Sequence, residues 1–248
     1  GVFEKIGYTE KNASLLQEMV DYSYELAKGW NPDGSTRILF RDNTLLIFAP
    51  YVDTSGYNNL SDMYYGCTKL SFIPALPTKG VLDFSGCFYS TNIQENPKWD
   101  YSNTLSLSNT FQLSKVVKIK GLIAPKCTSY NSTFSSCSYL TEIDYLDVGE
   151  VSGIGFYYMV QGCSKLVFMR LVNLGKSTLT SLDVSGATNW GTGSEENRQS
   201  LIDSLITYSY DRANAGMANF TIKLSANTKA LLTEEEIAQI TNKGFTIS

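Results

Sequence analysis

Apolar positions return along the middle of the chain at intervals of 23 to 26 residues. One column carries an aromatic or aliphatic side chain at Tyr64, Phe88, Phe111, Phe134 and Val160. Three more columns keep nearly the same step: Leu60, Phe84, Leu107, Tyr130 and Phe156; Cys67, Thr91, Ser114, Cys137 and Cys163; Leu70, Ile93, Val116, Leu140 and Leu166. A fixed period of this length predicts stacked coils, because each coil buries its apolar side against its neighbours.

A coil of this length is too short for two helices and suits a strand, a turn and a short helical segment, as in a leucine-rich repeat. The predicted strands are Leu45–Pro50, Leu70–Pro74, Ile93–Pro97, Val116–Lys120, Leu140–Asp144 and Leu166–Arg170. The predicted fold class is therefore an α/β solenoid, a leucine-rich repeat with coils of about 23 residues and a parallel β-sheet on the concave face.

Both ends of the repeated region carry patterns that suit caps. Residues 12–29 have apolar side chains at helical spacing and are predicted to form an N-terminal capping helix. Near the C-terminus the pattern predicts strand, helix, strand, helix and strand at Leu179–Val184, Glu195–Tyr208, Phe220–Leu224, Thr233–Asn242 and Phe245–Ile247. The second helix opens with a capping-box spacing. We expect these strands to continue the same parallel sheet through right-handed crossovers and to close the C-terminal end.

The predicted domain boundaries follow these patterns. Residues 1–43 form the N-terminal capping helix and lead-in, 44–185 the leucine-rich repeats, and 186–248 the C-terminal repeats and cap. We expect one continuous domain, because nothing between residues 170 and 200 has the composition of a flexible linker of useful length. A separate C-terminal domain is the alternative.

Composition and charge exclude several classes of function. The chain has 248 residues and a net charge of -4, which argues against a nucleic-acid-binding surface. No apolar run approaches the ~18 residues that a membrane helix needs. The absence of histidine excludes a Ser-His-Asp triad, a Cys-His pair and a histidine-ligated zinc site. The chain begins at Gly1 instead of Met, so we expect a processed or engineered fragment whose signal or anchor lies upstream.

Five cysteines make an odd number, so at least one is free or pairs between chains. None forms a C-x-x-C pair, and they are predicted to be small buried side chains. Cys137 and Cys163 lie in adjacent coils, where distance alone permits a disulfide. The pairs Gly153-Ile154-Gly155 and Gly191-Thr192-Gly193 are interpreted as turns, because neither completes a phosphate-binding loop. No catalytic residue, metal site or cofactor is predicted.

The outward side of the predicted sheet carries the candidate binding residues. The mid-strand positions are Phe72, Lys118, Glu142 and Phe168, and the strand exits are Lys120, Asp144 and Arg170. In the binding interpretation, the phenylalanines make apolar contacts and the charges form the rim. The alternative is a cross-strand ion-pair ladder without a binding role. Trp99 and Trp190 fall in predicted loops, where an aromatic ring stacks on a sugar or packs against the core.

Three of the iterated segments resemble the BspA-type, or treponemal-type, leucine-rich repeat. They are Met63-Tyr64-Tyr65-Gly66-Cys67-x-x-Leu70-x-x-Ile73-Pro74, Thr133-Phe134-Ser135-Ser136-Cys137-x-x-Leu140-x-x-Ile143 and Met159-Val160-Gln161-Gly162-Cys163-x-x-Leu166-x-x-Met169. The chain departs from the family pattern at Thr91, Ser114, Val160 and Asn96. The resemblance covers residues 44–185 and implies a bacterial surface protein, an adhesin or binding protein. Similar chains also occur in prophage or mobile-element regions.

These observations lead to one expected function and two alternatives. The expected function is a non-enzymatic, extracellular or cell-surface leucine-rich-repeat protein that binds or adheres to another macromolecule, a host or microbial protein. The first alternative is a carbohydrate-binding surface module with a glycan partner. The second is a structural, tail-associated protein of a phage or mobile element. We expect no nucleic-acid partner and no transmembrane segment in this fragment.

Overall fold

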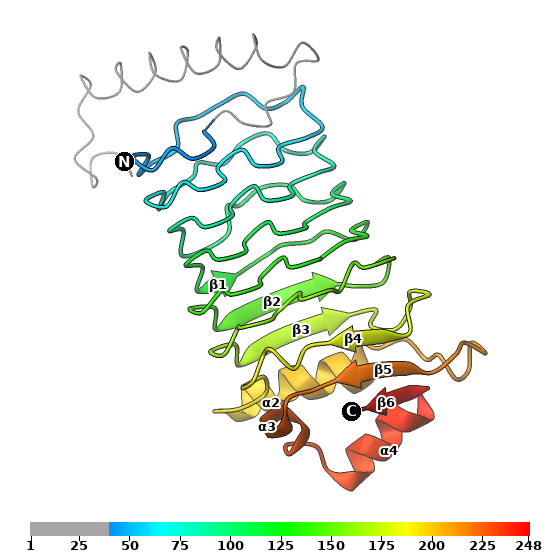
Figure 1. Ribbon diagram of the computed structural model, residues 1–248. Helices are drawn as coiled ribbons and strands as arrows, with labels where there is room; N and C mark the ends of the chain where they lie inside the picture. Colours follow the sequence, from blue (N-terminus) through cyan, green and yellow to red (C-terminus); the bar gives the residue numbers. More distant parts are fainter. Residues whose placement is uncertain (1–39) are drawn as a thin grey trace.

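The computed structural model describes residues 40–248 (Figure 1). The helix predicted at residues 12–29 lies outside the described residues. From residue 40 onwards the chain runs in successive layers, which follow one another along the molecule towards a C-terminal part that holds the helices (Figure 1). Most layers consist of turns and single bridges.

Backbone hydrogen bonds join each layer to the next. The N–H of Leu60 donates to the carbonyl of Asp83 at 2.9 Å, and the N–H of Phe84 donates to Ser106 at 3.1 Å. Donors of this kind recur at every second residue, and the N–H groups between them bond within their own layer. This alternation satisfies the backbone of a chain that has little regular secondary structure.

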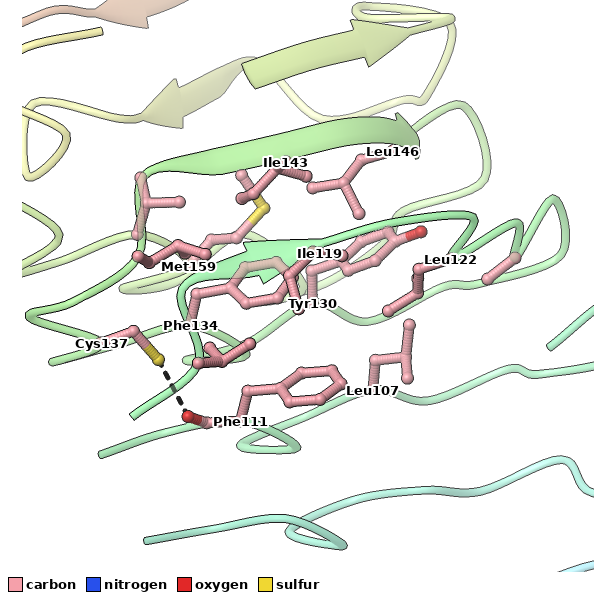
Figure 2. Close-up of a cluster of buried hydrophobic side chains, with 14 of the residues drawn as sticks. Leu107, Phe111, Ile119, Leu122, Tyr130, Phe134, Cys137, Ile143, Leu146 and Met159 are labelled. Atoms are coloured by element: carbon pink, nitrogen blue, oxygen red, sulfur yellow. Dashed lines mark hydrogen bonds between the residues drawn. The ribbon is translucent and has the colours of Figure 1, made fainter. Parts of the chain in front are cut away.

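The aromatic column predicted from the sequence lies inside the core as a stack of rings. Ring centroids are 5.3 Å apart for Phe40 and Tyr64, 6.1 Å for Tyr64 and Phe88, 5.2 Å for Phe88 and Phe111, and 5.7 Å for Phe111 and Phe134. Neighbouring apolar columns pack against it, and Figure 2 shows this cluster around Leu107, Ile119, Tyr130, Ile143 and Leu146. The hydrophobic core cluster extends from Phe40 to Phe245. The domain boundaries at 43/44 and 185/186 stay predictions.

The predicted α/β leucine-rich-repeat solenoid is wrong. Residues 40–248 contain only short helices and two separate three-stranded parallel sheets, with no solenoid closure. The first sheet has the order β1-β2-β3, formed by Lys118–Ile119, Glu142–Asp147 and Phe168–Val172. The predicted strands at 45–50, 70–74 and 93–97 are reduced to the isolated bridges Phe48–Phe72 and Glu95–Lys118. No continuous sheet therefore lines one face of the described residues.

Asn96 explains why the sheet does not extend past β1 at this point. Its side-chain oxygen accepts a hydrogen bond from the N–H of Lys120 at 2.7 Å, and its side-chain nitrogen donates to the Lys120 carbonyl at 3.0 Å. A side chain has thus replaced the backbone partner that a ladder requires. Pro97 follows and has no N–H to donate.

The C-terminal elements form their own sheet and do not continue the first one. Strands β4 (Ser181–Asp183), β5 (Phe220–Lys223) and β6 (Phe245–Ile247) pair in parallel in the order β4-β5-β6. The prediction that they extend the same sheet is wrong, because other groups occupy the free edge of β3. Ser204 Oγ accepts from the Leu171 N–H at 2.9 Å, and Trp190 Nε1 donates to the Met169 carbonyl at 2.9 Å.

Short helices connect the strands of the second sheet. The predicted helix at 195–208 is split into α2 (Glu195–Ile202) and a π-helical turn, η2 (Asp203–Thr207). A four-residue helix, α3 (Ala226–Lys229), follows β5. Helix α4 (Glu234–Asn242) has the predicted capping box, with Thr233 and Glu236 bonded reciprocally. Arg198 of α2 donates to both carboxylate oxygens of Glu236, at 2.7 and 2.8 Å, and so ties the two helices together.

Candidate functional site

The predicted mid-strand binding residues lie along one row of outward-facing positions. We call this row the outer row, and it consists of Phe48, Phe72, Glu95, Lys118, Glu142 and Phe168. Lys118, Glu142 and Phe168 occupy directly opposed positions of β1, β2 and β3. Phe72 bridges to Phe48 but not to Glu95. The layer that carries Glu95 therefore separates Phe72 from Lys118, Glu142 and Phe168.

The charges in the middle of the outer row are paired with one another. Lys118 Nζ lies 2.7 Å from Glu142 Oε2, and Lys120 Nζ lies 3.8 Å from Glu142 Oε1. The hydrogen bond to Glu142, together with its negative charge, raises the pKa of Lys118. The cross-strand ion pairs of the alternative interpretation are thus present, and they are exposed enough to contribute little to stability. The binding role of these residues stays a prediction.

The strand-exit residues have local partners as well. The carboxylate of Asp144 accepts from the Gly121 N–H, with its two oxygens at 3.1 and 3.2 Å. The guanidinium carbon of Arg170 lies 5.3 Å from the centroid of the Phe168 ring. Phe168 therefore presents an aromatic face that a cation already covers in part.

A hollow of about 390 Å³ lies beside Phe72, between this layer and the next. No backbone hydrogen bond joins residues 72–75 to residues 94–98, which is a gap in the bonding between these described layers. The side chains of Glu95 and Lys98 border the hollow. Ile73 and Ile93 form apolar walls, and the edges of the hollow are charged. This part of the outer row therefore resembles the pockets that hold apolar anchor side chains at protein interfaces.

The two loop tryptophans face the interior, so the interpretation that they pack against the core is confirmed and the sugar-stacking interpretation is wrong. Trp99 is buried and donates through Nε1 to the Pro74 carbonyl at 2.9 Å. Trp190 is fully buried against β3. Each indole N–H has a backbone acceptor, which is the usual requirement for a buried tryptophan.

All five cysteines are buried and free. Burial raises the pKa of Cys67 to about 11 and that of Cys137 to about 12. Thiols held protonated in this way are poor nucleophiles and poor metal ligands. Within residues 40–248 no group of three or more His, Cys, Asp and Glu side chains is arranged to hold a metal ion.

Sequence reasoning missed a second concave site. A cleft of about 760 Å³ opens between residues 153–161 and strand β4. Tyr157, Tyr158, Gln161, Asp183 and Lys223 are among the residues that line it. The sequence held one signal for this site, since the step to Val160 in the aromatic column is 26 residues where the preceding steps are 23 or 24. Two adjacent tyrosines occur within that longer step.

Across residues 40–248, no helix has the length and apolar character needed to cross a membrane. No protein-family model, curated protein or solved structure matches the chain.

Proposed function

We propose that this chain is a non-enzymatic bacterial protein of the cell surface or extracellular space, and that it binds another protein through the outer row. The surface location is supported by the resemblance of the iterated segments to BspA-type proteins. The non-enzymatic role is supported by the absence of histidine and by the buried, protonated thiols.

The observation that carries the proposal is the position of Phe72 beside a hollow with charged edges. Phe72 is only partly buried and lines this hollow. Phe48, its bridge partner in the preceding layer, continues its apolar surface. Interfaces concentrate their energy in such apolar anchors, surrounded by charges that set orientation and association rate. The paired Lys118 and Glu142 supply charges of both signs further along the row.

Affinity capture with matched variants tests this proposal. The parent chain, immobilised, is expected to retain a discrete protein from mucosal extract or bacterial lysate, and the double variant Phe72→Ala/Phe168→Ala is expected to lose it. The control Leu113→Ala/Ile123→Ala removes exposed apolar side chains outside the row and is expected to retain the same protein. The captured protein is then purified and its Kd measured against all three chains.

A second variant, with two charges exchanged, tests the outer row even if the phenylalanine variant does not fold. Lys118→Glu with Glu142→Lys keeps an ion pair between β1 and β2 but reverses its direction. We expect this variant to keep the circular dichroism of the parent and to bind the purified partner more weakly, chiefly through a slower association rate. Equal capture by the parent and both row variants would contradict the proposal.

A further inference from the structure

The cleft beside β4 marks the place where hydrogen bonding between layers stops. In the preceding layer the N–H groups of Tyr130, Ser132 and Phe134 donate to the next layer, at 2.8, 2.7 and 3.0 Å. The equivalent N–H groups one layer on belong to Phe156, Tyr158 and Val160, and none of them has an acceptor among residues 40–248. The ladder is therefore interrupted at the wall of the cleft.

The segment across the cleft pairs with the strand that follows it along the layers. Strand β4 forms its hydrogen bonds with β5, with Ser181, Leu182 and Asp183 opposite Thr221, Ile222 and Lys223. At the next turn the two chain segments meet again, because a Cβ atom on Gly186 would lie 2.5 Å from Gln161 Cα. The cleft is thus a wedge, held closed at Gly186 and open towards Gly153.

One wall of the wedge carries exposed aromatic and aliphatic side chains. Tyr157 is 56% exposed, Tyr158 47% and Ile154 70%. The tyrosine rings are 4.1 Å apart, and the Tyr158 hydroxyl donates to the Tyr157 hydroxyl at 3.2 Å. Rings that are fixed against each other in this way offer contact area at a low cost in side-chain entropy.

The polar groups around the cleft are neutral or mutually neutralised. The side chains of Gln161, Thr180 and Ser181 have no hydrogen-bond partner within the described part of the chain. Lys223 Nζ lies 2.8 Å from Asp183 Oδ2, and Ser185 donates to the other carboxylate oxygen at 2.6 Å. The site therefore offers free donors and acceptors but no unpaired charge for an ionic ligand.

From these features we infer that the cleft binds a neutral saccharide. A pyranose ring has an apolar C–H face, which suits Tyr157 and Tyr158, and a rim of hydroxyl groups, which suit Gln161, Thr180 and the free backbone N–H groups. The volume of about 760 Å³ lies within the range of about 300–1,000 Å³ found for small-ligand sites and accommodates a short oligosaccharide. This inference concerns a different surface from the outer row and goes beyond the proposed function.

A glycan array tests the inference on the full chain. Neutral oligosaccharides of glucose, galactose, mannose and N-acetylglucosamine are printed beside sialylated and sulfated ones. We expect binding to a neutral glycan, which isothermal titration then quantifies. Tyr157→Ala and Tyr158→Ala are each expected to weaken that binding about tenfold, by loss of ring contact. Tyr51→Ala removes an exposed tyrosine in another layer and is expected to change nothing.

Several results would overturn the inference. These are the absence of binding to any neutral glycan, binding confined to acidic glycans, and equal binding by the parent and both cleft variants. Peptides that bind in the cleft in place of sugars, and that the same variants lose, would overturn the ligand class. The variant Phe72→Ala/Phe168→Ala is expected to keep glycan binding, so that failure at one surface is distinguishable from failure at the other.

Discussion

At the residue scale, the cysteine column shows how buried polar atoms are satisfied. Three thiols donate to a carbonyl of the preceding layer, at 2.9 Å for Cys67 and Cys137 and 3.0 Å for Cys163 (Figure 2 shows the bond from Cys137 to Phe111). In the same column, Thr91 donates within its own layer, to the Phe88 carbonyl at 3.0 Å, and Ser114 Oγ lies 3.7 Å from Cys137 Sγ. The apolar periodicity of the sequence does not indicate that the cysteines act as donors.

We predict that the thiols of the folded chain resist alkylation. All five are buried, and burial favours the unreactive protonated form. Iodoacetamide at about pH 8 should label the native chain far more slowly than a free thiol, and should label five sites once urea unfolds it. Mass spectrometry counts the modified sites. Fast labelling of any cysteine in the native chain would show that its layer opens easily.

Alkaline pH is expected to destabilise the fold. Burial raises the pKa of Cys67 from 9.0 to about 11, and the pKa of buried Tyr64 and Tyr130 rises well above its ordinary value of 10.0. The folded state thus holds protons that the unfolded state releases, so this stabilisation is complete below pH 9 and is lost as the pH rises through about 11. Urea midpoints measured from neutral pH upwards should stay level and then fall above pH 9.

The urea midpoint is expected to stay level near neutral pH for a separate reason. The chain has no histidine, so it lacks the side chain that ordinarily titrates between about pH 5 and 8. A midpoint that changes steeply between about pH 6 and 8 would contradict this account, because it would require a carboxyl or thiol with a displaced pKa that titrates there.

At the element scale, the sequence predicts positions better than it predicts hydrogen bonding. Strands β1, β2 and β3 lie within or overlap the strands predicted at 116–120, 140–144 and 166–170, and α4 begins at its predicted capping box. The strand predicted at 93–97 fails because the side chain of Asn96 takes the place of a backbone partner. Apolar periodicity reports which side chains are buried, and it contains no information on a side chain that bonds to a strand edge.

The capping box of α4 gives a stability prediction. Thr233 Oγ1 accepts from the Glu236 N–H, and Glu236 bonds back to the Thr233 N–H at 2.8 Å. Thr233→Ala is expected to lower the free energy of unfolding by about 1 kcal/mol. Thr241→Ala, in the last turn of the same helix, is exposed and should change it by less than about 0.5 kcal/mol. Urea unfolding compares the two variants, and an equal loss in both would argue against the capping role.

At the scale of the whole molecule, two groups of layers meet at Gly186. The columns read from the sequence indicate the stacking of residues 60–166, because buried side chains repeat there at a steady step. The separate C-terminal sheet and the cleft could not be predicted in this way. Both depend on the pairing of β4 with β5 and on the contacts that Trp190 and Ser204 make with the free edge of β3, and all of these join residues that are distant in sequence.

Replacement of Gly186 tests this junction. A Cβ atom there would lie 2.5 Å from Gln161 Cα and 2.7 Å from the Val160 carbonyl oxygen. Gly186→Ala is expected to force the segments apart and to lower the free energy of unfolding by about 1–3 kcal/mol. Gly56→Ala, with no atom within 4 Å of its added carbon, should leave stability unchanged or raise it slightly. Similar stability of the two variants would contradict the close approach.

The interruption of bonding between layers at residues 156–158 is the feature on which the cleft depends, and amide hydrogen exchange measured by NMR tests it most directly. The N–H groups of Tyr130 and Ser132 are bonded to the next layer and should exchange slowly. Those of Phe156 and Tyr158 occupy equivalent places, have no acceptor among residues 40–248, and should exchange much faster. Equal protection of all four amides would show that the layers are bonded without a break and that the cleft is closed.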